Sequence, residues 1–153
     1  MSESMPCPCG SQKLYRQCCA PLHIDERPAA TAEALMRSRF SAFYLAAKGK
    51  PELCDYLLNT WHKSQYSDAA KALQDLKQSA LHQQWHSLKI IETCAGQAGD
   101  KVGIVQFIAF FTPTADTGVQ QLHERSNFCF EDGRWFYIDG SFQADIKLQR
   151  NEP

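Results

Sequence analysis

Four of the seven cysteines in this 153-residue chain fall within residues 7–19, in the order Cys-x-Cys, eight residues, Cys-Cys. They are Cys7, Cys9, Cys18 and Cys19. One residue separates the first two, so an extended backbone points both thiols to the same side. Four thiolates complete the tetrahedral shell that zinc prefers, and such a shell leaves no open position for a substrate. The spacing therefore predicts a structural zinc site within a small knuckle.

Two other states of these thiols are open: two disulfides within the knuckle, or four free thiols. The first ten residues contain neither a basic start nor an apolar run, so no secretory signal is expected. We therefore expect the chain in the reducing cytoplasm, where disulfides are rare. Spacing and compartment together favour zinc, whose binding free energy would fold a segment with little apolar core of its own.

The other candidate metal ligands give weaker signals. His23 lies four residues past the cluster and could substitute for one thiolate, but its position beyond Pro21 favours a surface histidine. The remaining cysteines, Cys54, Cys94 and Cys129, stand at intervals that suggest no pairing scheme. We expect all three to be buried as small hydrophobic side chains.

A short helix is predicted to position the second pair of cysteines. Ser11 is a good N-cap for a helix that starts near Gln12, carries Cys18 and Cys19, and ends before Pro21. Such a helix is too short to persist alone in water, which again calls for a shared cation.

The rest of the chain has the pattern of an α+β domain. Helical spacing predicts helices over 31–48, from Pro51 to about Trp61, and over 67–84, with Thr31 and Ser67 as N-caps. Strand-like patterns follow over 86–94, 102–112, 119–131 and 134–139, and Asp132-Gly133 is a two-residue hairpin turn. Three helices packed on one side of a four-stranded antiparallel meander are expected. We divide the chain into a knuckle over 1–22, a linker over 23–30 and this domain over 31–153.

Composition and charge exclude two classes of partner. The chain is 44% hydrophobic and 22% charged, as in soluble globular proteins. A net charge of −1 provides no field that would attract nucleic acid or an anionic membrane. The most apolar segment, Val102–Phe111, is too short to span a bilayer, so no membrane insertion is expected.

A second group of residues could do acid–base chemistry. Alternation along the third strand places Glu124 on the same face as large apolar side chains, so its carboxylate should point toward the helices. An unpaired buried carboxylate is costly, and Arg39 and His62 are its candidate partners. The group is either an internal ion pair or a pocket in which burial prepares Glu124 as a general acid or base.

The knuckle resembles the SEC-C motif, named for the zinc-binding tail of the SecA translocation ATPase. The four cysteines match its ligand positions, and Gly10, Ser11 and Tyr15 match its framework positions. In the SecA tail this motif docks partners. The resemblance therefore implies a protein-binding or assembly role for the knuckle rather than catalysis.

The whole chain resembles the YchJ-like family of uncharacterised bacterial proteins. The shared blocks are LMRSRFSAF at 35–43, TWHKS at 60–64, ERSNF at 124–128 and GRWFYIDG at 133–140. This resemblance implies that the larger domain has the nuclear transport factor 2-like fold, a curved antiparallel sheet around helices with a cone-shaped pocket. Members of that superfamily often pair through the exposed sheet face, which implies a homodimer. Many family members carry a second SEC-C knuckle at the C-terminus, and residues 150–153 resemble the run that introduces it.

Two functional interpretations follow. In the preferred one the chain is a non-enzymatic cytoplasmic protein, whose knuckle docks a partner protein and whose larger domain is a scaffold or binds a small molecule. In the alternative it is an enzyme that acts on a small molecule in the cone, with Glu124 as general acid or base and Arg39 or His62 tuning it. The fold alone does not separate them.

Overall fold

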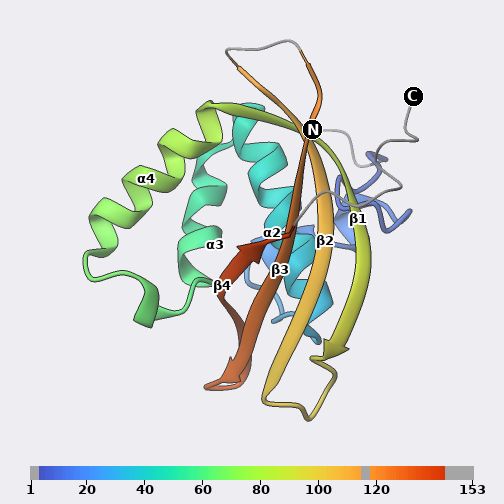
Figure 1. Cartoon of the computed structure of the whole chain (residues 1–153), viewed down its shortest axis with the longest axis vertical. Coiled ribbons are helices and arrows are strands. Elements are labelled where there is room, and N and C mark those ends of the chain that lie inside the picture. The colour runs from blue at the N-terminus through green and yellow to red at the C-terminus, as the bar shows by residue number, and fades with distance from the viewer. Residues whose placement is uncertain (1–3, 115–117, 144–153) are drawn as a thin grey trace.

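The computed structural model describes residues 4–114 and 118–143. A small cysteine-bearing segment is followed by helices and then by an antiparallel sheet (Figure 1). Within the described residues the helical elements are η1 (Tyr15–Gln17), α1 (Ala20–His23), α2 (Ala32–Ala47), η2 (Pro51–Leu53), α3 (Cys54–Asn59), η3 (Lys63–Gln65) and α4 (Ala69–Leu81). The strands are β1 (Gln83–Ala95), β2 (Val102–Pro113), β3 (Gln120–Glu131) and β4 (Arg134–Phe142). The prediction of an α+β fold is confirmed.

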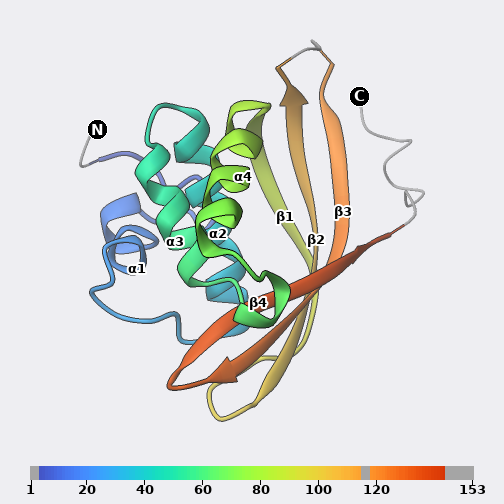
Figure 2. The same cartoon turned by 90° about the vertical axis from the view of Figure 1, so that its left-hand side faces the viewer.

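The four strands form one antiparallel meander in the order β1-β2-β3-β4. The sheet is curved, and the helices lie together on one of its faces (Figure 2). Asp132 and Gly133 both have positive φ, at 54° and 81°. These are the dihedral angles that a type I′ hairpin turn requires, so β3 returns directly into β4 as predicted.

Helix α2 is the centre of the packing. Its N-cap is Thr31, whose side chain accepts a hydrogen bond from the backbone N–H of Ala34, as the sequence predicts. Leu35 and Phe40 pack from this helix against the sheet in one hydrophobic core with Phe128 and Trp135. The other face of the sheet also buries side chains, since Ile108 and the polar His123 are paired across β2 and β3 and both are buried.

The junction between α4 and the sheet differs from the prediction. The N-cap of α4 is Asp68 rather than Ser67, because the Asp68 carboxylate accepts from the backbone N–H of Lys71. The helix ends at Leu81, and β1 begins at Gln83, which pairs with Pro113 of β2. Cross-strand pairing with β2 therefore starts earlier than the alternation in the sequence indicates.

The predicted helix from Gln12 is wrong. Gln12 has a φ of 70°, which a right-handed helix cannot use. The segment instead folds back on itself, since the backbone N–H of Cys7 donates to Lys13 and that of Tyr15 donates to Met5. Pro21 does not end a helix but lies in the first turn of α1, where its missing N–H removes no helical hydrogen bond.

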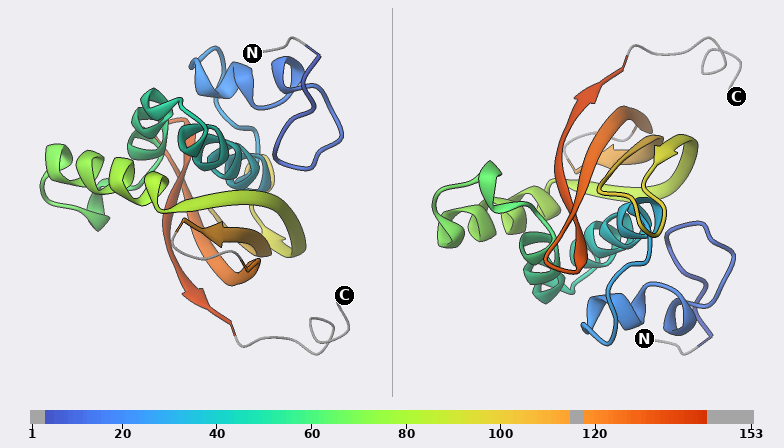
Figure 3. Two further views of the ribbon diagram at one scale, coloured as in Figure 1. Left: turned by 90° about the horizontal axis from the view of Figure 1, so that it is seen from above. Right: turned by 90° about the horizontal axis from the view of Figure 1, so that it is seen from below.

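The cysteine-bearing segment packs beside α2, on the other side of that helix from α4 (Figure 3). Among the described residues, no helix has the length and apolar character needed to cross a membrane.

Candidate functional site

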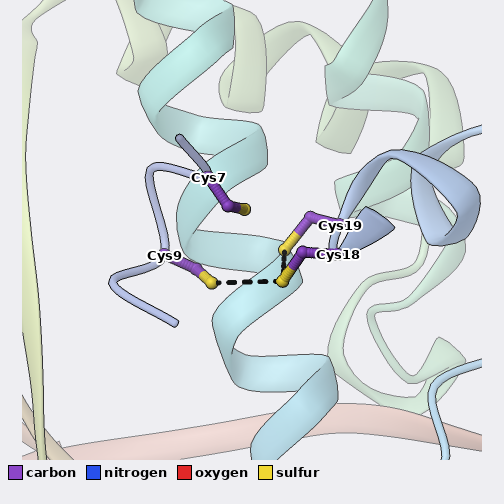
Figure 4. Close-up of side chains that lie close together, drawn as sticks. All are labelled: Cys7, Cys9, Cys18 and Cys19. Atoms are coloured by element: carbon purple, nitrogen blue, oxygen red, sulfur yellow. Dashed lines mark hydrogen bonds between the residues drawn. The ribbon is translucent and has the colours of Figure 1, made fainter. Parts of the chain in front are cut away.

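The four cysteines of the knuckle converge on one point. One Sγ atom from each of Cys7, Cys9, Cys18 and Cys19 lies within 4.8 Å of the other three. The Cys9 and Cys18 sulfurs are 3.6 Å apart, and those of Cys18 and Cys19 are 3.9 Å apart (Figure 4). All four are free thiols, and three of them are buried. This cluster could hold a metal ion.

The electrostatics of the cluster call for a positive charge. The pKa of the Cys9 thiol is lowered because side-chain hydrogen bonds with Cys19 and Cys7 stabilise its thiolate. The pKa of Cys19 is raised because its hydrogen bonds with Cys7 and Cys9 favour its protonated form, and burial raises it further. One thiolate is thus favoured and further ones are opposed, so a cation would be needed for all four to ionise together.

Arg37 fixes the knuckle to α2. Its Nη1 donates to the backbone carbonyl of Cys9 at 2.7 Å, while its Nε donates to Glu33 at 3.0 Å. Since Glu33 lies one turn earlier on the same helix, it holds the guanidinium in place for the bond to the knuckle.

His23 is not the surface histidine that we predicted. Its Nε2 lies 2.8 Å from the backbone carbonyl of Ser38, and its Nδ1 lies 2.6 Å from the Tyr15 hydroxyl. A carbonyl only accepts, so Nε2 carries the proton and Nδ1 accepts from Tyr15. Burial lowers the pKa of His23. Both ring nitrogens are thus used to join the knuckle to α2, and His23 is not a member of the cysteine cluster.

The three remaining cysteines have different surroundings. Cys54 is fully buried, Cys129 is partly buried, and Cys94 is exposed. The prediction that all three are buried is therefore wrong for Cys94, which lies near the end of β1, where the side chains are mostly exposed.

A second candidate site is a cavity of about 370 Å³ lined by residues of α2, α4 and the sheet. Aromatic side chains form much of its wall: Phe40, Phe43, Trp61, Trp85, Phe107 and Phe111. Glu124 lines this cavity, as the alternation along β3 predicts, and so does Arg39. A largely apolar cavity with a few polar groups is typical of small-molecule sites.

Glu124 is held by two hydroxyl groups rather than by an ion pair. Its Oε2 accepts from Ser126 Oγ at 2.8 Å and from the Tyr137 hydroxyl at 2.9 Å. No donor reaches its Oε1 within residues 4–114 and 118–143. Sequence reasoning missed both partners, although Ser126 shares the core face of β3 and Tyr137 follows the hairpin turn on the neighbouring strand.

Glycine at position 140 provides the space for this carboxylate. Gly140 pairs with Ser126 across β3 and β4. A Cβ atom added at Gly140 would overlap the side chain of Glu124. The bare backbone there lets Glu124 lie flat against β4 and reach Tyr137.

Arg39 belongs to the cavity but does not pair with Glu124. Its Nη1 donates to the backbone carbonyl of Leu57 and to Thr60 Oγ1, both at 2.7 Å. Its guanidinium carbon lies 4.7 Å from the centre of the Tyr137 ring. Burial lowers the pKa of Arg39 to about 10. Tyr137 therefore contacts both charged groups, Arg39 through its ring and Glu124 through its hydroxyl.

His62 lies outside the cavity wall. Its Nε2 is 2.7 Å from a carboxylate oxygen of Glu131, and its ring packs edge-on against Phe136. The ligand atoms of His62, Cys129 and Glu131 lie within 4.8 Å of one another, a group that the sequence analysis missed. However, the backbone N–H of Ser64 donates to His62 Nδ1. Nε2 then carries the proton and donates to Glu131, so a metal could bind there only after that tautomer changed.

The comparisons with known proteins agree with this architecture. Residues 6–21 match the SEC-C motif, and residues 31–140 match the family described as YchJ, middle NTF2-like domain. The solution structure of a SEC-C motif containing protein from Rhodopseudomonas palustris is 30% identical. It superimposes with a TM-score of 0.75, over 92% of this chain and 100% of that one.

A second solved structure is similar. The crystal structure of a SEC-C motif containing protein from Psychrobacter arcticus is 27% identical and has a TM-score of 0.69. The match covers 96% of this chain and 88% of that one. With its α+β fold and its four-cysteine cluster, this chain belongs to the YchJ family, as a middle NTF2-like domain preceded by a SEC-C motif.

Proposed function

We propose that this protein binds a small molecule in the cavity between α2, α4 and the sheet. The observation that carries the proposal is a largely apolar space of about 370 Å³ in which one carboxylate oxygen has no donor from residues 4–114 and 118–143. A space of this size and lining is at the lower end of the range found for small-ligand pockets. A cavity filled by its own side chains would not support this role.

Filling the cavity tests this proposal. Leu122 lines the cavity, whereas Val119 lies just outside the same strand and is exposed. The fluorescent probe 1-anilinonaphthalene-8-sulfonate should bind the unmodified chain, and Leu122→Phe should weaken it by about tenfold because the added ring takes ligand volume. Val119→Phe, the matched control, should leave the dissociation constant unchanged. Equal binding by all three proteins would contradict the proposal.

An enzymatic role for the same cavity is the alternative. Glu124 is the group that would act as general acid or base, because its unpartnered Oε1 could exchange a proton with a bound molecule. If the cavity is an active site, mass spectrometry should find a retained molecule that changes on incubation with the unmodified protein. It should stay unchanged with Glu124→Gln.

We assign zinc to the knuckle. With zinc–sulfur bonds of about 2.3 Å, a tetrahedral site has sulfur–sulfur edges of about 3.8 Å. The two sulfur–sulfur distances of 3.6 and 3.9 Å bracket this value. Four protein ligands fill the shell, so the role of the ion is structural. A cluster that must remain reduced to bind zinc suits a reducing compartment such as the cytoplasm.

The knuckle is also the proposed docking site for a partner protein. A groove of about 430 Å³ runs beside the cysteines and is lined by the cationic side chains of Lys13, Arg27 and Arg37. Lys13 and Arg27 are exposed and form no ion pair with another described residue, so an acidic segment of a partner would find two cations there. Replacing both by Glu should abolish binding of a short polyglutamate peptide, while Lys71→Glu on α4 should not. Unchanged peptide binding in the double variant would remove this role.

A further inference from the structure

Arg39 is a buried cation that forms no direct ion pair with a carboxylate of the described residues. Only 6% of its surface is exposed. None of the ion pairs among residues 4–114 and 118–143 includes it. Its protein partners are two neutral oxygens and the face of Tyr137. The charge of Glu124 favours the Arg39 cation through space, but no direct bond joins the two groups. A buried charge without a directly bonded counter-charge is costly, so a direct anionic partner of Arg39 is missing among the described residues.

The donors of Arg39 are only partly used. A guanidinium has five N–H groups, and the two bonds to Leu57 and Thr60 both come from Nη1. In the described part of the chain, Nε and Nη2 have no acceptor, yet neither is sealed from water. Arg39 lines the cavity of the proposed ligand site, and a ligand there is the acceptor that we assign to these two nitrogens. Nε and Nη2 together form the edge of a guanidinium that binds a carboxylate with two parallel hydrogen bonds.

The cavity also has a negatively charged lining residue, Glu124. Tyr137 contacts Arg39 through its ring face and donates its hydroxyl to Glu124, whose Oε1 has no donor among the described residues. An anionic group at Glu124 would be repelled, whereas a hydroxyl or amine there would donate to Oε1. The aromatic side chains that line the cavity suit a flat apolar body.

We infer that the ligand is a compact aromatic or apolar carboxylic acid, whose carboxylate binds Arg39 and whose far end donates a hydrogen bond to Glu124. This inference rests on the proposed binding function and adds the chemical class of the ligand. The space of about 370 Å³ restricts the ligand to a small body such as one fused ring pair with a short side chain.

A matched series of three indoles tests the inference on the full zinc-loaded chain. Indole-3-acetate has the carboxylate, indole-3-acetamide is its neutral counterpart, and tryptamine has an amine. Isothermal titration calorimetry at pH 7 should show the acetate binding at least about tenfold tighter than the acetamide, because a charge-assisted bidentate bond replaces a neutral one. Tryptamine should bind no tighter than the acetamide.

Two results would overturn the inference. The first is equal or tighter binding of the acetamide or tryptamine. The second is no binding by any of the three indoles while 1-anilinonaphthalene-8-sulfonate still binds in a Leu122-dependent way. Loss of all binding, that probe included, would instead contradict the proposed binding function itself.

Two variants test whether Arg39 causes the preference for indole-3-acetate over indole-3-acetamide. Arg39→Met should reduce the ratio between the acetate and acetamide constants to within about twofold. Tyr137→Phe keeps the ring beside Arg39 and removes only the hydroxyl bond to Glu124, so the ratio should persist. A preserved ratio in Arg39→Met would contradict the assignment. If that variant does not fold, because Arg39 also binds Leu57 and Thr60, the indole series on the unmodified chain decides alone.

Discussion

Single atoms decide the geometry of the cavity at the residue scale. Glu124 keeps its place because Tyr137 and Ser126 donate to one of its oxygens and because position 140 has no Cβ. The sequence predicts that Glu124 points inward but not which groups satisfy it. Ser126 lies two residues further along β3, whereas Tyr137 comes from the neighbouring strand β4, where a bulge in the pairing between Asn127 and Phe128 shifts the register.

Gly140→Ala should disturb this arrangement. The new methyl group would overlap the Glu124 side chain, so the carboxylate must move and lose its bond to Tyr137. We expect a loss of about 1–3 kcal/mol in the free energy of unfolding, measured by urea denaturation. Gly118→Ala is the control, because a Cβ there meets no atom within 4 Å. Equal stability of the two variants would show that Glu124 moves without cost.

At the scale of elements, the knuckle and α2 form one unit. The knuckle has little core of its own, and its contacts are hydrogen bonds from Arg37 and His23 together with the burial of Leu22 against the main core. The proposed division at residues 22 and 30 stays a prediction. The boundary after residue 22 divides the short helix α1, which contains both Leu22 and His23, so contacts that stabilise the knuckle lie on both sides of it.

Cys18→Ser should show how far this unit extends. Losing one thiolate should abolish binding of the proposed zinc, measured as a fall from about one metal ion per chain to none. Because Arg37 and His23 then lose ordered partners, amide hydrogen exchange should accelerate in α2 as well as in the knuckle. Cys94→Ser, which alters an exposed thiol, should change neither quantity. Faster exchange confined to residues before Pro21 would mean that the knuckle is only tethered to the domain.

At the scale of the whole molecule, a chain of hydrogen bonds connects the knuckle to the cavity. Tyr15 contacts His23, His23 contacts Ser38, and the Ser38 hydroxyl contacts Tyr56. The carbonyl of Tyr56 accepts from Thr60, which in turn accepts from Arg39. The knuckle is therefore connected to Arg39 in the cavity by a continuous series of hydrogen bonds.

The stability of the whole chain should depend on pH through His23. Its pKa in the folded chain lies below the ordinary value of 6.5, so the unfolded chain binds more protons between these two values. The contribution of His23 is complete above pH 6.5 and is lost as the pH falls through the folded pKa. Urea unfolding at pH 7.5 and 5.5 gives the loss of unfolding free energy on acidification. This loss should be smaller for His23→Gln than for the unmodified chain, and for His82→Gln it should equal that of the unmodified chain. Equal losses in the unmodified chain and both variants would show that folding does not lower the pKa of His23.

The sequence by itself determined the four metal-ligand candidates, the order of helices and strands, and the inward direction of Glu124. These follow from short-range spacing: cysteines close along the chain, a helical stripe in α2 and a two-residue alternation in β3. The tertiary structure decided the rest. His23 is half-buried because the knuckle docks on α2. Residues 150–153, which resemble the run before a second knuckle, lie outside the described residues. Arg39 and Glu124 face one cavity without pairing, and Tyr137, brought in by strand pairing, contacts Arg39 with its ring and Glu124 with its hydroxyl. Contacts between residues far apart in sequence depend on register and docking, which local patterns do not encode.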